Sequence, residues 1–176
     1  EFEGLSNGGA GYASARTTAP VPGVGRAGLS YPAVDSKKVY TEPVAIFGLR
    51  QNSEDRSNVA LVDAGTSGNA VLKMTVVNAD GKSAVAFEPV TLAPGEWNQY
   101  NGILDQTGKG WTEGWVIVEP LPGSAPFLAY GVFNNNGTND GSYVSAVPDS
   151  QVDAFLGVPV IVEVGDRFSS ELMLTN

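Results

Sequence analysis

The sequence predicts an all-β protein folded as an antiparallel sandwich. Its 176 residues include 22 Gly and 11 Pro, which interrupt the chain too often for helices of ordinary length. Between these breaks lie short runs rich in apolar residues, at the spacing that is typical of a sandwich. A chain of this length can bury a sizeable core without disulfides, and it contains no Cys.

Eight strands are expected, one for each of these runs. They cover residues 39–48, 58–63, 70–78, 83–92, 97–101, 114–119, 127–133 and 142–147. In residues 72–76, Leu, Met and Val alternate with Lys and Thr, so one face of this strand should meet the core and the other face water. Turn residues at 78–81 and a Pro-Gly pair at 94–95 should each join strands that pair antiparallel.

Parts of the sequence repeat. The matching segments, in chain order, are 13–15 with 129–131, 31–36 with 144–150, 42–46 with 158–162, and 57–63 with 170–176. Short strands can resemble one another by chance, but matches that keep the same order favour a repeat. The chain would then hold one complete repeat, residues 36–147, between the end of one repeat (1–35) and the beginning of another (148–176).

The two partial repeats would each expose an unpaired strand edge and half of a hydrophobic face, which soluble proteins normally avoid. Two solutions stay open. The two ends of one chain can pair, or the end of one molecule can complete the start of the next by strand addition, which gives an open head-to-tail fibre. We favour assembly between molecules through the apolar side chains of the second partial repeat, namely Val158, Val160, Val162, Leu172 and Leu174.

Composition excludes several functions. Ten Lys and Arg stand against 19 Asp and Glu, a net charge of −9, which would repel nucleic acid. The absence of Cys and His removes thiol nucleophiles, Ser-His-Asp triads and Cys/His zinc sites. No run approaches the roughly 18 apolar residues that span a bilayer, so we expect no membrane insertion. A Cys-free exported protein fits a bacterial or archaeal exterior, and we expect it to be secreted or held at the cell surface.

Two stretches resemble a known family. They are residues 56–62, followed by a hairpin, and residues 129–132, followed by an Asn/Gly/Asp loop and the Ser-Tyr-Val of residues 142–144. Together they resemble the repeated Ig-like β-sandwich modules of large bacterial secreted and surface proteins. The resemblance implies an antiparallel Ig-like β-sandwich, here one complete repeat flanked by two partial repeats. It also implies a scaffold or adhesive role outside the cell, and it transfers no catalytic residue.

The loop at residues 134–141 is a candidate metal site. The side-chain oxygens of Asn134, Asn136, Asn139 and Asp140 lie close together in sequence in a Gly-bearing loop that could wrap calcium. The loop has only one carboxylate, however, and calcium loops usually carry several. An Asx-rich turn that joins two strands is therefore the favoured interpretation, and no other cofactor is expected.

Trp111 is the candidate ligand residue. It lies in a polar loop, where an exposed indole could stack on a sugar ring. The favoured interpretation is that Trp97 and Trp115 belong to the core and that Trp111 covers the end of the core. The carboxylates at 88, 96, 105, 113 and 119 show no spacing that singles out a catalytic pair. The sequence therefore predicts a non-enzymatic extracellular structural protein that associates with itself, with a carbohydrate-binding or adhesin-type module as the alternative.

Overall fold

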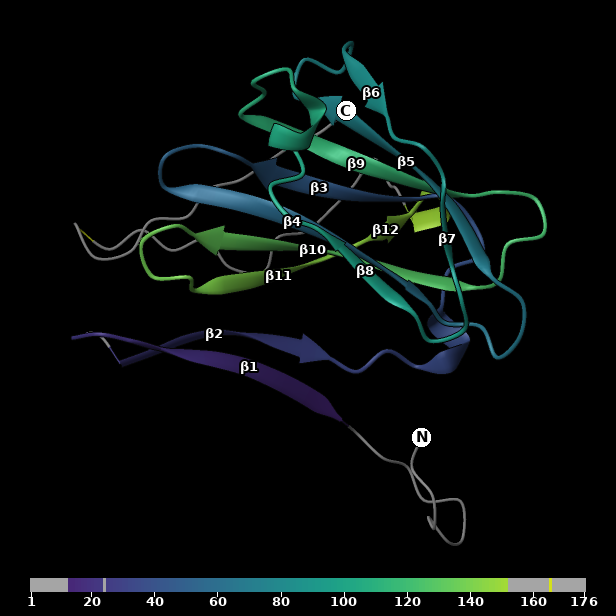
Figure 1. Cartoon of the computed structure of the whole chain (residues 1–176), viewed down its shortest axis with the longest axis horizontal. Helices are drawn as coiled ribbons and strands as arrows, with labels where there is room; N and C mark the ends of the chain where they lie inside the picture. The colour runs from purple at the N-terminus through teal and green to yellow at the C-terminus, as the bar shows by residue number, and fades with distance from the viewer. Residues whose placement is uncertain (1–12, 24, 152–164, 166–176) are drawn as a thin grey trace, which may run out of the picture.

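The protein is an all-β antiparallel sandwich. The computed structural model describes residues 13–23, 25–151 and 165, and strands form the layers seen in Figure 1. The strands are β1 Ser14–Val21, β2 Gly25–Pro32, β3 Val44–Arg50, β4 Asp55–Asp63, β5 Ala70–Asn78, β6 Ala84–Ala86, β7 Val90–Leu92, β8 Trp97–Tyr100, β9 Glu113–Pro120, β10 Phe127–Asn135, β11 Gly141–Ser145 and β12 Val147–Pro148. Three short 3-10 helices are η1 Ser36–Lys38, η2 Asp105–Thr107 and η3 Asp149–Gln151. No helix in the described part of the chain is long and apolar enough to cross a membrane.

Two sheets face each other. One has four strands in the order β11-β10-β4-β8, and the other has the order β12-β3-β9-β5-β6, with β7 also paired to β5. The central strand pair of the first sheet is β4–β10, which is paired from Asp55↔Asn135 to Asp63↔Phe127. All of the paired strands are antiparallel, as the turn residues predict.

The core fills the space between the two sheets. Alternate residues of each strand point inward because successive side chains of a strand alternate between its faces. The fully buried core side chains of the two sheets are Val59, Leu61 and Phe127 on one side and Val44, Ile46, Leu49, Leu72, Met74, Val76, Val116 and Val118 on the other. Leu92, Ile103 and Leu104 are fully buried in the same core.

The alternation expected in β5 is confirmed. Leu72, Met74 and Val76 are buried, whereas Lys73 reaches Glu119 at 3.8 Å on the outer face. The turn after β5 also has the expected chemistry, because the Asp80 carboxylate accepts hydrogen bonds from the backbone N–H groups of Lys82 and Ser83. These bonds hold the pKa of Asp80 well below its ordinary value.

Two local expectations differ from the structure. The strand expected at 83–92 is divided into β6 and β7, because Pro89 lies in the gap and has no N–H for the ladder. The Pro-Gly turn at 94–95 was expected to join paired strands. Instead, β7 pairs with β5 and β8 pairs with β4, so this turn carries the chain from one sheet to the other.

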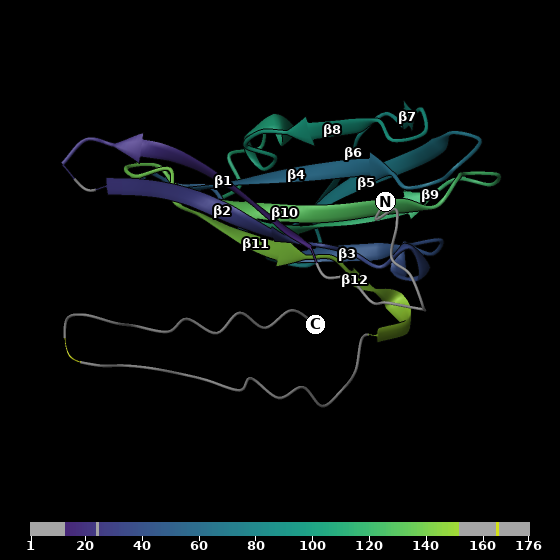
Figure 2. The ribbon, with the colours of Figure 1, turned by 90° about the horizontal axis from the view of Figure 1, so that it is seen from below.

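The first described strands form a separate layer. β1 and β2 pair only with each other, from Ser14↔Pro32 to Val21↔Gly25. Their hairpin lies along β10 and β11, on the side of the four-stranded sheet that faces away from the six-stranded sheet (Figures 1 and 2). The sandwich therefore has a third layer, which covers part of its outer face.

The proposed repeat boundaries fall partly outside the described residues. The complete unit expected at 36–147 includes every strand from β3 to β11 and the first residue of β12. The candidate assembly residues Val158, Val160, Val162, Leu172 and Leu174 lie outside the described residues. The division of the chain into repeats stays a prediction.

Candidate functional site: the terminal hairpin and the crevice beneath it

The β1–β2 hairpin has two different strands. In β1 the side chains from Ser14 to Thr17 are all exposed, and the strand has no partner on its second edge in the part of the chain that the structure describes. In β2, Ala27 and Leu29 are only 7% and 8% exposed. β2 thus holds the hairpin to the molecule, and β1 offers a free edge.

Side chains at alternate positions anchor β2. Ala27, Leu29 and Tyr31 face the sandwich, as the period of two in a strand requires, and Leu29 lies against Gly141 at the start of β11. The backbone N–H of Gly28 donates to the Asp140 carboxylate over 3.1 Å. Apolar contacts and this hydrogen bond together fix the hairpin to β11 and to the loop before it.

A cluster of tyrosines joins the hairpin to the sheet. The Tyr31 ring meets Tyr130 and Tyr143 edge-on, with centroids 5.7 and 6.2 Å apart, and the Tyr130 and Tyr143 rings stack at 5.3 Å. Burial and the neighbouring Tyr130 raise the pKa of Tyr31 above its ordinary value, and burial likewise raises the pKa of Tyr143. Both phenols therefore stay neutral in the physiological range, where they can donate hydrogen bonds.

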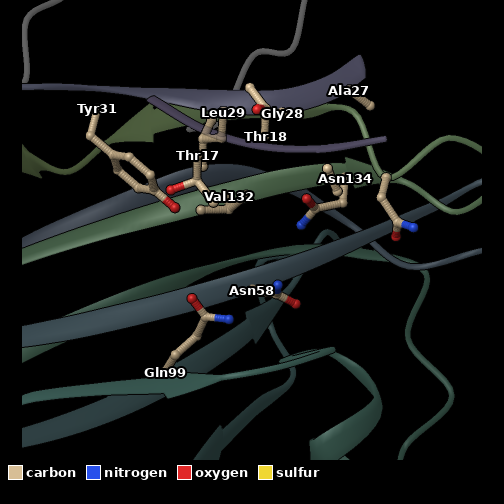
Figure 3. A pocket seen from close by; sticks show the side chains of 12 residues that line it. Thr17, Thr18, Ala27, Gly28, Leu29, Tyr31, Asn58, Gln99, Val132 and Asn134 are labelled. Atoms are coloured by element: carbon tan, nitrogen blue, oxygen red, sulfur yellow. The ribbon is translucent and has the colours of Figure 1, made fainter. Parts of the chain in front are cut away.

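A crevice of about 210 Å³ lies between the hairpin and the outer face of the sheet. Figure 3 shows side chains from β1, β2, β4, β8 and β10 around it. It is lined by Thr17, Thr18, Ala19, Ala27, Gly28, Leu29, Tyr31, Asn58, Gln99, Val132, Asn134 and Asn139. Not one of these side chains carries a charge, although the whole chain has a net charge of −9.

Several polar groups of the crevice lack a protein partner. Asn58 is 7% exposed, and its Oδ1 accepts from the Gly102 N–H. Gln99 donates from Nε2 to Asn101. Within the described residues, the remaining amide group of each, Asn58 Nδ2 and Gln99 Oε1, makes no hydrogen bond, and neither does the side chain of Asn134 or the Tyr31 hydroxyl. The crevice therefore presents free donors and acceptors side by side.

The loop at residues 134–141 has most of its oxygens in use. The Arg56 guanidinium donates to Asn136 Oδ1 over 2.9 Å and to Asn139 Oδ1 over 2.8 Å, so a cationic side chain of β4 occupies these two candidate metal ligands. Asp140 accepts from the Gly28 N–H. Asn134, the fourth candidate, lines the crevice together with Asn139. Three of the four candidate side chains thus already have hydrogen-bond partners in the protein.

The tryptophans are arranged differently from the expectation. Trp111 is half-buried against the edge of the core, which fits a side chain that covers its end. Trp97 is 52% exposed and donates from Nε1 to the Tyr130 hydroxyl over 3.0 Å. Trp115 lies between inward-facing Gly114 and Val116 and so faces outward. The expectation that Trp97 and Trp115 belong to the core was wrong, because strand alternation places them on the outer faces.

Four of the five acidic residues considered as catalytic candidates have partners of their own. Glu96 accepts from the Ala93 N–H and Asp105 accepts from Gln51. Glu113 lies 3.9 Å from Arg50 and Glu119 lies 3.8 Å from Lys73. These carboxylates serve turns and strand pairs, and the described residues contain no group of three or more His, Cys, Asp or Glu side chains that could hold a metal ion.

The sequence alone does not reveal the crevice. Its anchor has a recognisable signal, since Ala27, Leu29 and Tyr31 alternate with Gly28 and Ser30 in the pattern of a strand with one buried face. The polar lining has no such signal, because its residues come from five strands and one loop that only the fold brings together.

Comparisons with known proteins find no matching family model, no matching curated protein and no matching solved structure. The resemblance to Ig-like surface modules therefore rests on the residues quoted for it. What the protein does has to follow from its own side chains and from its free strand edge.

Proposed function

We propose that the protein is a non-enzymatic structural protein of the bacterial or archaeal cell exterior, built from repeated Ig-like modules and joined head to tail to further copies by strand complementation. The observation that carries the proposal is the free edge of β1. A strand edge with unpaired N–H and C=O groups is a template for another strand, and β1 is exposed along most of its length.

The likeness of two hairpins supports the repeat. β1–β2 and β10–β11 are both antiparallel hairpins, and each is followed by a 3-10 helix, η1 after β2 and η3 after β12. In the sandwich, β10 uses its second edge to pair with β4. If β1 corresponds to β10, its free edge is the place for a strand that corresponds to β4, and residues 170–176 match β4 in sequence.

The β4–β10 ladder gives the register of this pairing. In that ladder Val132 lies opposite Asn58. By the sequence matches, Val132 corresponds to Arg16 and Asn58 corresponds to Glu171. A strand added to β1 in the same register would place these opposite charges across from each other. An exposed pair of this kind contributes about 0.2–1 kcal/mol, and like charges in its place destabilise.

Charge reversal tests the proposal. Arg16→Glu and Glu171→Arg should each weaken association about three- to ten-fold by light scattering, because each variant opposes like charges. An equal mixture of the two variants should associate as the wild type does, since each head then meets a tail of opposite charge. Lys109→Glu is the matched control. It makes the same change of charge at an exposed position in the loop before β9, away from the hairpin, and should leave association unchanged.

Two outcomes would contradict the proposal. If the two variants stay weakened when mixed, Arg16 and Glu171 of different chains do not meet at the contact. If neither variant differs from Lys109→Glu, residues 170–176 do not pair with β1 in this register.

A further inference from the structure

We propose that the crevice between the β1–β2 hairpin and the four-stranded sheet binds a neutral saccharide. The site is separate from Trp111, which lies against the core. Its lining includes Thr17, Thr18 and Ala19 of β1 but not Arg16, and it adds a ligand to the structural role rather than restating it.

The lining selects against charged ligands. None of the residues that line the crevice carries a charge in the physiological range, since the Tyr31 phenol, like any ordinary tyrosine, is neutral there. The nearest charged groups are occupied, since Arg56 donates to Asn136 and Asn139, Arg26 donates to Thr18, and Asp140 accepts from Gly28. An ion that entered the crevice would lose hydration without gaining a counter-charge.

The free groups fit hydroxyls. A sugar hydroxyl both donates and accepts, and it is best held by groups that offer both functions. Asn58 supplies a free N–H donor, Gln99 a free acceptor and Asn134 both (Figure 3). Asn58 is more than nine-tenths buried and lines the crevice, so a ligand hydroxyl or a water in the crevice can bond to its amide.

The apolar part of the lining and the size of the crevice agree with a sugar ring. Ala27, Leu29 and Val132 line the crevice beside the polar groups, and the part of them that remains exposed forms the apolar wall that the C–H face of a ring would meet. The volume of about 210 Å³ is below the roughly 300–1,000 Å³ of sites for drug-sized ligands. It suits a single ring or the end of a longer chain.

An aromatic strip offers a path for such a chain. Tyr31 at the crevice contacts Tyr130, and the Tyr130 hydroxyl accepts from the exposed Trp97. The rings form a continuous series across the outer face of the sheet, from the crevice to solvent. Further sugar units of an oligosaccharide can contact these rings, because aromatic rings present large apolar surfaces.

Calorimetric titration with cellohexaose, maltohexaose and chitohexaose tests the inference on the full chain. At least one of these neutral oligosaccharides should bind, and Asn134→Ala and Gln99→Ala should each weaken that binding about ten-fold through loss of hydrogen bonds to hydroxyls. Asn69→Ala is the matched control, because Asn69 is an exposed amide outside the crevice and should leave the affinity unchanged. Equal melting temperatures for the variants would show that folding is intact.

The result is independent of assembly if Arg16→Glu, which removes a charge at the free edge and not in the crevice, binds the saccharide as the wild type does. Binding that Asn134→Ala and Gln99→Ala leave unchanged would overturn the inference, and so would the failure of all three oligosaccharides to bind. Preferential binding of a sulfated glycan would also overturn it, because the crevice has no cation to hold sulfate.

Discussion

At the scale of single residues, Asp63 is the side chain on which the end of β4 depends. It is 2% exposed, and its two carboxylate oxygens accept from the backbone N–H groups of Gly65 and Ala70, each over 2.7 Å. The loop between β4 and β5 is thereby tied back onto the strand. Charge-assisted bonds of this kind are among the stronger hydrogen bonds in proteins.

Asp63→Ala should lower the free energy of unfolding by about 2–4 kcal/mol, because it leaves two donors without an acceptor near the core. Urea unfolding followed by Trp fluorescence measures the loss. Asp35→Ala is the control, since Asp35 is exposed and accepts a single N–H bond from Lys37, and it should cost only about 0.5–1 kcal/mol. Equal losses in the two variants would contradict the role assigned to Asp63.

The burial and orientation of individual side chains were harder to predict from the sequence than the strands themselves. The buried face of β5 follows from alternation alone, and Leu72 and Met74 confirm it. The outward position of Trp97 depends on the register of β8 against β4, which a four-residue strand does not reveal. Asn58 is buried although it is polar, because the hairpin covers it and Gly102 bonds to it, and neither contact is local in sequence.

At the scale of elements, the β1–β2 hairpin depends on Gly28. A Cβ atom at this position would overlap the Thr17 carbonyl oxygen and lie 2.8 Å from Thr18 Cγ2. At residue 28, β1 therefore lies too close to β2 for any residue with a Cβ atom. The requirement for glycine is thus steric, and it concerns the hairpin rather than the sandwich.

Gly28→Ala should open the hairpin while the sandwich stays folded. Overpacking of this kind costs about 1–3 kcal/mol, so amide hydrogen exchange in residues 14–32 should become about five- to a hundred-fold faster, with protection of β4 and β10 unchanged. Exchange measured by mass spectrometry resolves the two regions. The control is Ser30→Ala, at an exposed position of the same strand. Unchanged exchange in Gly28→Ala would show that the hairpin tolerates a side chain there.

Most elements could be predicted because their signals are local. The strands from β3 to β11 follow from short apolar runs and from Gly, Pro and Asx turns. The break between β6 and β7 could have been read from Pro89. The partner of β8 could not be predicted, because a Pro-Gly turn can join two strands of a hairpin or carry the chain from one sheet to the other. The pairing of β8 with β4 brings together residues about 35–41 positions apart in the sequence, which no local signal reveals.

At the scale of the whole molecule, the sandwich was predictable and its third layer was not. Composition and strand spacing are sufficient for two packed sheets. The position of the hairpin depends on three tyrosines from segments more than 90 residues apart and on the bond between Gly28 and Asp140. That layer creates both the crevice and the exposed strand β1, so the two functional proposals depend on the same packing.

The central claim is that copies of this chain join through the free edge of β1. Light scattering of the wild-type protein over a wide concentration range, with negative-stain electron microscopy of the same samples, tests it most directly. We expect a mass that rises with concentration and rods that lengthen with it, because a head-to-tail contact that does not close continues without limit. A mass that stays that of a single chain at the highest concentration, with no rods, would contradict it.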